Sequence, residues 1–517
     1  MTRLRMHPPE TAPPAWAAAL LAHLEHQAST APDRLACGDT LIKLDWRAFH
    51  AAVTEVREAL QAYGGHRLQP DGRGTPIVGI HLRNSVEFAV ATFAIATLGA
   101  AFELFPTDLD DDTLKALVRA SDARVVITEH APSLAGRDGD VHFVSPAALL
   151  EKRMPDSGTD APAANADADA GADAIFSIVY SSGTTGIPKS IMHSYAAREA
   201  VCAALSAMGV GEQARTLVAL PMTNNLALVT WWSTLCNGGA IVILDRFDPP
   251  SFCRAVESQR VTHFVLSPAQ YRELLASPEV GRHDLSSIVM HLSSGSRLWP
   301  AEKRRIAQHL PGSFREIYGV TEGGVGTMLD CSELDKLHTV GKPIGMYEMK
   351  IIDEAGNPLP PNAIGRIVGR ATFMMSRYGD PRRAEPYWRP ADDPARRYLI
   401  AGDLGYFDDD GYLVVLDRAD DTLITPAGRL FPSRIEAALL AATTCVELAV
   451  VIHAGDDADS SELVLHWVGP DDQEAALARW LECHVPIASR LVRTACLPRN
   501  GAGKVLRHQL RSPSIVA

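Results

Sequence analysis

The chain has 517 residues, of which 46% are hydrophobic and 21% are charged, and its formal net charge is −13. The length predicts two or more domains, the composition is that of a soluble globular protein, and the negative charge argues against nucleic acid as the main partner. No stretch of about 18 uninterrupted apolar residues is present to span a bilayer. The first apolar run, residues 15–27, is interrupted by His and Glu and predicts an amphipathic helix rather than a secretory signal.

The eight cysteines form no C-x-x-C pair and show no metal-ligand spacing. They are interpreted as buried or free thiols of a reducing compartment, so a cytoplasmic location is expected. The cysteines therefore predict neither a disulfide framework nor a metal site.

Strand and helix patterns alternate through the first part of the chain. Buried strands are predicted at 77–82, 123–129, 175–180, 216–220, 240–244, 263–267 and 288–295. Helices are predicted at 85–100, 111–121, near 226–236 and near 249–259. This alternation predicts an α/β fold with layered sheets, whereas the small polar residues of 157–173 predict a solvated loop.

The pattern changes after about residue 340. Short alternating runs at 348–371 and 411–421 contain Gly and Asn-Pro turns, which indicates antiparallel β structure. The last hundred or so residues carry their own strand signals at 446–453 and 462–468. We therefore expect a large N-terminal α/β domain, a β-rich subdomain and a small α+β domain at the C-terminus.

A glycine-rich loop follows the strand predicted at 175–180, in the sequence "IFSIVYSSGTTGIPKS". Glycines allow backbone N–H groups to approach an anion, hydroxyls donate further hydrogen bonds and a lysine supplies charge. The stretch does not fit G-x-x-x-x-G-K-[ST], because Lys189 follows Pro188 and the glycines stand three apart. Its composition leaves two readings open, a different phosphate loop and an ordinary turn.

Four further stretches place Gly, Ser, Thr, Asp, Glu or Lys in turns or at strand ends. They are "SSGSRLWP" at 293–300, "IYGVTEGG" at 317–324, "YLIAGDLGYFDDDGYLVVLDRADD" at 398–421 and "LPRNGAGKVLR" at 497–507. Asp403 is expected just after a strand, Arg418 at a strand end, and Tyr318 in a turn. Each stretch alone is usually an ordinary turn. A dinucleotide-type match at 209–214 is rejected because a helical pattern precedes it.

In combination and in this order, these stretches resemble the adenylate-forming superfamily of acyl- and aryl-CoA synthetases, peptide-synthetase adenylation domains and luciferases. "VYSSGTTGIPKS" resembles its phosphate loop, with Ser190 in place of the usual Gly. "IYGVTE" resembles its aromatic-Gly-x-Thr-Glu motif, and "AGDLGYFDDDGYLVVLDRADD" its Gly-Asp and Arg-x-Asp motifs. "NGAGKVLR" resembles its catalytic-lysine loop, and "LGAAFELFPTD" at 98–108 an upstream core motif. The resemblance covers nearly the whole chain.

The resemblance implies that a carboxylic acid reacts with ATP to give an acyl-adenylate and pyrophosphate. The acyl group then passes to the thiol of coenzyme A or of a carrier protein's phosphopantetheine arm. Lys504, Thr321 and Glu322 are the implied catalytic residues, with Mg²⁺ held by Glu322. The implied ATP-binding residues are Ser181, Ser182, Gly183, Thr184, Thr185, Gly186, Lys189, Gly295, Ser296, Tyr318, Asp403 and Arg418.

The resemblance also implies two domains, residues 1–417 and 418–517, with a hinge at Asp420. The second domain would carry Lys504 in for adenylation and then rotate for thioester formation. Ala427 stands where the family commonly has a glycine that borders the phosphopantetheine channel. The sequence leaves coenzyme A and a carrier protein open as acceptors.

The acid-binding residues implied by the resemblance are Asn224, Asn225 and Gly319. The position of Asn225 carries an Asp in amino-acid-activating domains and an Asn in aryl-acid ligases, where it binds a ring hydroxyl. An aryl or hydroxy acid is therefore expected, with a fatty or other aliphatic acid as the alternative. Asn225 could instead serve only as a helix cap. A catalytically silent nucleotide-binding homologue is the alternative of another class.

Overall fold

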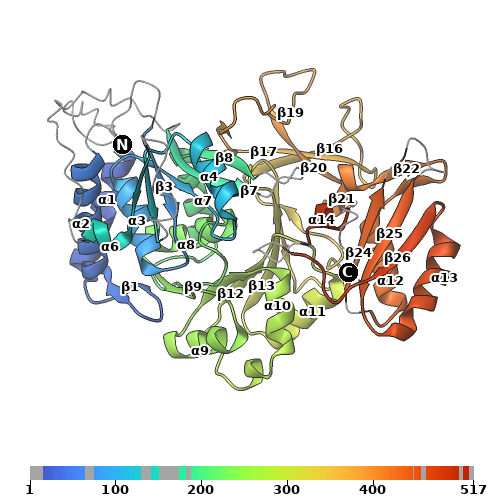
Figure 1. Ribbon diagram of the computed structural model, residues 1–517, viewed down its shortest axis with the longest axis horizontal. Helices are drawn as coiled ribbons and strands as arrows, with labels where there is room; N and C mark the ends of the chain where they lie inside the picture. Colours follow the sequence, from blue (N-terminus) through green and yellow to red (C-terminus); the bar gives the residue numbers. More distant parts are fainter. Residues whose placement is uncertain are drawn as a thin grey trace. The chain divides into compact units, whose positions relative to one another are not determined.

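The structure is a computed structural model that describes residues 15–64, 75–129, 141–150, 174–181, 188–445, 447–453, 455, 461–499 and 505–511. The chain forms two compact units (Figure 1). The first unit contains Met1–Leu266, Glu273–His291 and Thr372–Glu385. The second unit contains Ser267–Arg272, Leu292–Ala371 and Pro386–Ala517.

One sheet of the first unit carries the glycine-rich loop. Its strand order is β18-β8-β7-β4-β3-β5-β6, and the strands from β7 to β6 are parallel to their neighbours, whereas β8 and β18 are antiparallel. The strands are β3 (Ile77–His81), β4 (Ala101–Leu104), β5 (Val125–Thr128), β6 (His142–Val144), β7 (Ile175–Ser181), β8 (Lys189–Ser194) and β18 (Arg377–Tyr378).

A second group of strands in this unit pairs in the order β11-β9-β10-β1-β2. They are β1 (Leu35–Gly38), β2 (Lys43–Asp45), β9 (Arg215–Val218), β10 (Ala240–Ile243) and β11 (His263–Leu266). The helices of the unit are α1 (Ala15–Thr30), α2 (Trp46–Gly64), α3 (Val86–Thr97), α4 (Asp111–Ala120), α6 (Pro146–Leu150), α7 (Tyr195–Ala207), α8 (Asn225–Cys236) and α9 (Pro249–Gln259), together with the short η2 (Pro278–Gly281).

Helices α3 and α8 form the centre of the first unit because they are apolar nearly all round. Both contact strands of the second group, and α3 also contacts β3 and β4. Trp232 of α8 stacks on Phe93 of α3 with ring centroids 4.2 Å apart, and meets Phe176 of β7 edge-on at 5.0 Å. Trp231 is also fully buried. The two tryptophans are therefore core residues.

The second unit is largely antiparallel, as the sequence predicted after residue 340. β13 (Ser313–Gly319), β14 (Gly326–Asp330) and β15 (Lys342–Pro343) pair in order, and a five-stranded sheet joins β16 (Tyr347–Ile352), β17 (Gly365–Ala371), β20 (Tyr398–Phe407), β19 (Tyr387–Trp388) and β21 (Leu413–Arg418). Helix α11 (Pro300–His309) packs on β13. Helix α10 (Pro268–Ala276) and strand β12 (Met290–Ser293) each contain residues of both units.

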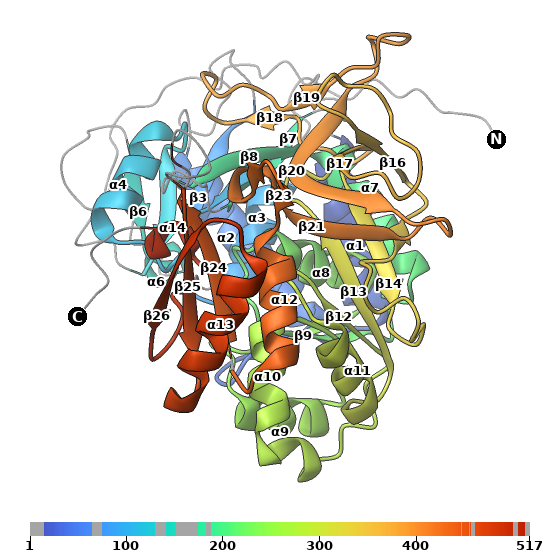
Figure 2. The ribbon, with the colours of Figure 1, turned by 90° about the vertical axis from the view of Figure 1, so that its right-hand side faces the viewer.

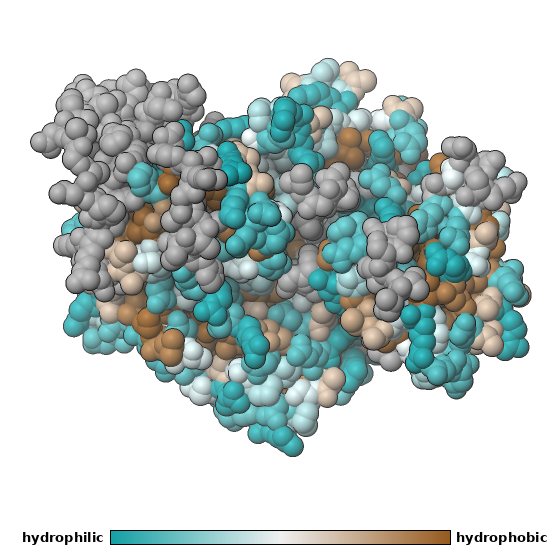
Figure 3. Space-filling model, in the orientation of Figure 1, coloured by the Kyte–Doolittle hydropathy of each residue, from teal (hydrophilic) through white to brown (hydrophobic). Residues whose placement is uncertain are grey.

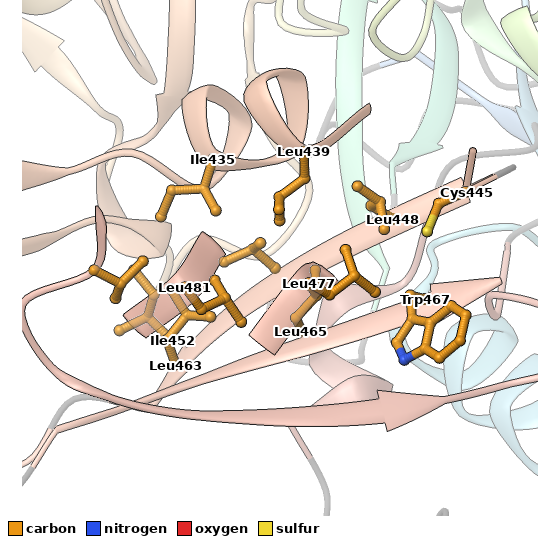
Figure 4. Close-up of a cluster of buried hydrophobic side chains, with 12 residues drawn as sticks. Ile435, Leu439, Cys445, Leu448, Ile452, Leu463, Leu465, Trp467, Leu477 and Leu481 are labelled. Carbon is orange, nitrogen blue, oxygen red and sulfur yellow. The ribbon is translucent and has the colours of Figure 1, made fainter. Parts of the chain in front are cut away.

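The C-terminal segment of the second unit has its own sheet and core. β24 (Glu447–His453), β25 (Glu462–Val468) and β26 (Ala488–Arg493) form the sheet. Figure 4 shows leucines of α12 (Pro432–Ala442) and α13 (Glu474–His484) in one cluster with side chains of the sheet, with Trp467 at one edge of it. The remaining elements are η3 (Ala419–Asp421), the hairpin β22 (Leu423–Thr425) and β23 (Gly428–Leu430), η4 (Asp471–Gln473) and α14 (Arg507–Leu510).

Each strand and helix predicted above within the described residues is present, with its ends shifted by a few residues. The loop expected at 157–173 lies outside the described residues. The boundary between residues 417 and 418 stays a prediction. On the face shown in Figure 3, hydrophilic side chains cover most of the described surface of each unit, and hydrophobic ones form small separate groups. None of the described helices has the length and apolar character needed to cross a membrane.

Candidate active site

The glycine-rich loop lies between two paired strands of the first unit. β7 ends at Ser181 and β8 begins at Lys189, and these two residues face each other in the antiparallel register. The predicted strand before the loop is therefore confirmed, and the loop connects a β-hairpin. The predicted phosphate ligands Ser182, Gly183, Thr184, Thr185 and Gly186 lie outside the described residues.

Ser190, which replaces the usual glycine of the phosphate loop, is accommodated by a glycine opposite it. Its backbone carbonyl accepts a hydrogen bond from the Gly379 N–H at 3.0 Å. A Cβ added at Gly379 would lie 2.3 Å from Ser190 Oγ, closer than real side chains approach. The serine at position 190 therefore depends on glycine at position 379.

Glu103 supports the first strand of this hairpin and was not singled out from the sequence. The carboxylate of Glu103 in β4 is buried, and Tyr180 Oη of β7 donates to its Oε1 at 2.5 Å. Ser121 Oγ donates to its other oxygen. Burial raises the pKa of Glu103 to about 7, although both hydrogen bonds act to lower it. The available signal was a carboxylate inside the apolar run "AFELF".

Three predicted nucleotide-binding residues come together in the second unit. Tyr318 Oη donates to Asp403 Oδ2 at 2.6 Å, and Arg418 Nη1 lies 3.5 Å from Asp403 Oδ1. The same Arg418 nitrogen donates to the Ala401 carbonyl at 3.0 Å. Asp403 is buried and faces Arg418 directly across the β20–β21 pair. Figure 2 shows these two strands side by side. We call these three residues, Tyr318, Asp403 and Arg418, the Asp403 cluster.

Two expectations about the backbone here were wrong. Asp403 lies inside β20 rather than after a strand, because the strand continues through an irregularity next to Gly402, which has a φ of +82°. A Cβ at Gly402 would lie 2.6 Å from Arg418 Nη2, so the glycine also leaves space for the guanidinium. Tyr318 lies in β13 rather than in a turn, because pairing with β14 extends to Gly319. Arg418 does end a strand, as predicted.

The remaining predicted residues of the second unit occupy bends and turns. Gly295 and Ser296 lie in a bend after β12, and Gly295 has a φ of +94° with no atom within 4 Å of an added Cβ. Thr321 and Glu322 lie in the turn after β13, as predicted. Arg297, next to Ser296, donates to the carbonyls of Val415 at 3.3 Å and of Leu416. This arginine therefore fixes the bend to β21, close in sequence to Arg418.

Asp417 links β21 to the C-terminal segment and was also missed. Its carboxylate accepts hydrogen bonds from the Ser433 N–H at 3.1 Å and from Ser433 Oγ at 2.8 Å, in the first turn of α12. Burial raises the pKa of Asp417 to about 6, against the opposing effect of the Arg297 charge. The sequence signal was weak, because Asp417 stands beside three other acidic or basic residues in "DRADD".

The predicted hinge and lysine fall in the same segment. Asp420 lies in η3, and its neighbour Asp421 is paired with Arg511 at 2.6 Å. Lys504 lies outside the described residues, but Arg499 and Val505 on either side of it form an antiparallel bridge. Ala427 is exposed in the turn of the β22–β23 hairpin, whose left-handed residue is the following Gly428.

Asn224 and Asn225 lie at the start of α8 in the first unit, and they do different things. Asn224 is the N-cap, since its Oδ1 accepts from the Leu226 N–H at 2.8 Å. Asn225 is therefore not the cap, and its buried Oδ1 makes no hydrogen bond in the part of the chain that the structure describes. Gly319, the third predicted acid-binding residue, ends β13 in the second unit.

Residues 24–379 match the family described as AMP-binding enzyme, which is more than half of the chain. The chain belongs to the AMP-binding enzyme family. The predicted resemblance to adenylate-forming enzymes is thereby confirmed. The chain is an AMP-forming acid–thiol ligase, which activates a carboxylic acid with ATP before the acyl group is transferred to a thiol.

The chain is similar to several curated ligases over most of its length. A 2-succinylbenzoate–CoA ligase of Bacillus licheniformis is 29% identical, over 94% of this chain and 98% of the relative. 4-Coumarate–CoA ligase 5 of Oryza sativa is 30% identical, over 83% of each chain. Feruloyl-CoA synthase of an Amycolatopsis species is 28% identical, over 83% of this chain and 87% of the relative.

Solved structures confirm the fold. O-succinylbenzoate coenzyme A synthetase from Bacillus subtilis in complex with AMP superimposes with a TM-score of 0.76 at 24% identity, over 95% of this chain and 98% of that one. ATP-bound MatB from Rhodopseudomonas palustris gives a TM-score of 0.80 at 23% identity, over 96% of this chain and 98% of that one. The predicted class, a large α/β part with a β-rich part and a small C-terminal α+β part, is therefore confirmed.

Proposed function

We propose that this chain activates an aromatic carboxylic acid that carries a hydroxyl or similar polar group near the carboxylate, and transfers it to coenzyme A. The relatives named above act on 2-succinylbenzoate, coumarate and ferulate, all aromatic acids, and all are named for coenzyme A. The observation that carries the proposal is the buried amide oxygen of Asn225. A buried acceptor without a partner costs about 1–3 kcal/mol, and a substrate hydroxyl would satisfy it by donating.

The Asp403 cluster suits the ribose of ATP. A carboxylate accepts hydrogen bonds from both hydroxyls of a ribose, and here Asp403 is already oriented by Tyr318 and Arg418 at opposite oxygens. The open space beside Gly295 leaves room for a flat base near the bend that Arg297 holds. We assign ribose binding to Asp403 and Arg418, and adenine contact to Tyr318, Gly295 and Ser296.

The charge that develops on the phosphates needs cations. We assign the β- and γ-phosphates to the loop from Ser181 to Lys189, the α-phosphate to Thr321, and the bridging of acid and phosphate to Lys504. No group of three or more His, Cys, Asp or Glu side chains that could hold a metal ion occurs among the described residues. Glu322 would therefore hold Mg²⁺ together with the phosphates of the substrate, which is the usual arrangement for this ion.

The acid is tested with matched pairs of aromatic acids that differ only in a hydroxyl beside the carboxylate. We expect the wild type to prefer the hydroxylated acid in kcat/KM, and Asn225→Leu to reduce that preference roughly tenfold, about 1.4 kcal/mol. Asn224→Ser is the control for the helix start, since serine also caps helices. An unchanged ratio in Asn225→Leu, with unchanged thermal stability, would remove Asn225 from the acid pocket and favour an aliphatic acid.

The acceptor is tested by supplying free coenzyme A to the adenylated enzyme. We expect the aryl-CoA thioester to form at a rate comparable to adenylation. Formation only with a phosphopantetheine-carrying protein would replace coenzyme A by a carrier protein as the partner. A cytoplasmic location fits the eight free cysteines, and fractionation of cells would test it.

A further inference from the structure

Two cysteines that the proposed reaction does not use lie together in the first unit. Cys202 belongs to α7, and Cys236 is the last residue of α8. Both are half-buried, and Cys202 lies against the last turn of α8, which carries Ser233 and Cys236. Ser233 Oγ donates to Cys202 Sγ at 3.3 Å, and Asn237 Nδ2 donates to the Cys202 carbonyl at the same distance. The middle of α7 and the C-terminal end of α8 are thus held against each other around this pair.

The neighbouring groups shift the pKa values of the two thiols in opposite directions. Arg198 lies one helical turn before Cys202, is buried, and is held by Ser177 Oγ at 3.0 Å and His193 Nδ1 at 3.1 Å. Hydrogen bonding by Cys236, then by Ser233, and the Arg198 charge lower the pKa of Cys202, against burial and the nearby charge of Glu199. Hydrogen bonding to Cys202 and burial raise the pKa of Cys236. The Cys202 sulfur is therefore suited to act as the nucleophile, whereas the Cys236 sulfur stays protonated as a thiol.

We propose that Cys202 and Cys236 form a reversible disulfide in response to a hydroperoxide, and that this bond reduces the affinity for the acid. The Cys202 thiolate attacks a peroxide oxygen and breaks the O–O bond, which gives a sulfenic acid and releases hydroxide. The Cys236 sulfur then attacks the sulfenic sulfur. An S–S bond forms, the S–O bond breaks, and the departing hydroxide leaves as water with the Cys236 proton. Two thiols and hydrogen peroxide thus give one disulfide and two waters.

The two helices that carry the cysteines lead to two parts of the proposed site in the first unit, which are Asn225 and the hairpin of the phosphate loop. Helix α8 starts at Asn225, whose amide we assign to the acid, so this part of the inference rests on the proposed function. Helix α7 follows β8, which begins at Lys189, and Arg198 holds Ser177 in β7. A covalent bond between the helices would restrain α8 relative to the hairpin of the phosphate loop. We therefore expect a change in KM for the acid rather than loss of the fold.

The other thiols supply internal controls. Cys37 and Cys253 are buried. Burial raises the pKa of both thiols, that of Cys253 to about 11. Both should resist oxidation. Cys483 and Cys496 are exposed, so they should react with an alkylating agent before and after peroxide treatment. In the oxidised protein, only Cys202 and Cys236 should be protected from alkylation. Reduction of their disulfide by dithiothreitol should make both thiols reactive again.

The test treats the folded full chain with one equivalent of hydrogen peroxide, alkylates it with N-ethylmaleimide in denaturant, and maps peptides by mass spectrometry. We expect a linked peptide pair containing Cys202 and Cys236, lighter by two hydrogen atoms, that is absent in Cys236→Ser and present in Cys253→Ser. In Cys236→Ser, Cys202 should accumulate as sulfenic acid, trapped by dimedone. Random pairing that includes Cys483 or Cys496, or no linked pair at all, would overturn the site.

The effect on the enzyme is measured separately. Oxidation of the wild type should raise KM for the preferred acid about threefold to tenfold, the size of typical coupling between sites, and dithiothreitol should reverse it. Cys202→Ser and Cys236→Ser should show no change with peroxide. A disulfide that forms while KM stays constant would overturn the regulatory part. If no acid supports catalysis, the proposed function fails, whereas the mass spectrum still decides whether the disulfide exists.

Discussion

Two regions of the molecule each pair a tyrosine hydroxyl with a buried carboxyl, and they differ in the second group beside that carboxyl. In the first unit, Tyr180 donates to the buried carboxyl of Glu103 at 2.5 Å. In the second, Tyr318 donates to the buried carboxyl of Asp403 at 2.6 Å. Asp403 also has Arg418 Nη1 at 3.5 Å, whereas Glu103 also accepts a hydrogen bond from the hydroxyl of Ser121.

The two sites differ in the groups that the buried carboxyl meets. Burial raises the pKa of Glu103 to about 7, so the group is partly protonated at neutral pH while it supports β7. Arg418 lies beside Asp403, and we propose that Asp403 accepts hydrogen bonds from a ligand there. We propose that the first arrangement supports the frame of the site and that the second binds a ligand.

The largest effect is expected for a cation that acts on the reacting groups themselves. Lys504→Ala should reduce adenylation by about 10²- to 10⁴-fold, the range for losing a charge stabiliser. The same variant should still form the thioester from preformed aryl-adenylate, because the proposed rotation about Asp420 removes Lys504 from the second step. Rates of the two half-reactions, measured separately, check this. Equal loss in both would contradict the two-step account and leave Lys504 as a general structural residue.

A third buried carboxyl, that of Glu316, also has a cation beside it, but we assign it no role in ligand binding. Lys303 Nζ of α11 lies 2.5 Å from Glu316 Oε2 and donates to the Thr339 carbonyl at 2.7 Å. Lys303→Met should lower the free energy of unfolding by about 3–5 kcal/mol, since it leaves Glu316 buried without its partner. The double variant with Glu316→Gln should recover part of this loss. Urea unfolding measures both, and equal stability of the single and double variants would disprove the pairing argument.

Glu103→Gln should remove the pH dependence of stability that the buried Glu103 carboxyl causes. Because the folded pKa lies above the ordinary value of 4.5, the stability that the protonated Glu103 contributes is complete below about pH 4.5. It is lost as the pH rises through about 7. Relative to wild type, the variant should therefore gain stability between pH 5 and pH 8, by on the order of 3 kcal/mol at most. Asp417 also titrates in this range but is common to both proteins, so the difference between their unfolding curves isolates Glu103.

The smallest of these effects is expected at Asp403. Asp403→Asn keeps the size and most of the hydrogen bonding but removes the charge facing Arg418. We expect KM for ATP to rise about 10- to 10²-fold, corresponding to about 1.5–3 kcal/mol for hydrogen bonds to a charged group. The KM for the acid should change much less. If both KM values rise together while thermal stability falls, Asp403 supports the fold rather than the nucleotide.

Much of this arrangement could be predicted from the sequence. The strand pattern before Ser181 and the alternating runs after residue 340 follow from hydrophobic periodicity, which depends on neighbours in the chain. The order of the motifs indicated the family. Tyr318, Asp403 and Arg418 were named in advance, although they are far apart in sequence.

What could not be predicted depends on contacts between distant segments. Glu103 meets Tyr180 across 77 residues, and Asp417 meets Ser433 because α12 starts where β21 ends. Asp403 was expected just after a strand, yet pairing with β21 keeps β20 intact through it. The capping role considered for Asn225 belongs to Asn224, a shift of one residue that only the backbone geometry decides.

The central claim is that this chain makes aryl-adenylates, and ATP–pyrophosphate exchange tests it most directly. Purified enzyme with Mg²⁺ is given a panel of aromatic acids with and without a hydroxyl near the carboxylate, together with short, medium and long aliphatic acids. We expect exchange that requires Mg²⁺, is fastest with a hydroxylated aromatic acid, and falls with Lys504→Ala. Exchange only with aliphatic acids would contradict the proposed substrate, and no exchange with any acid would contradict the enzyme itself.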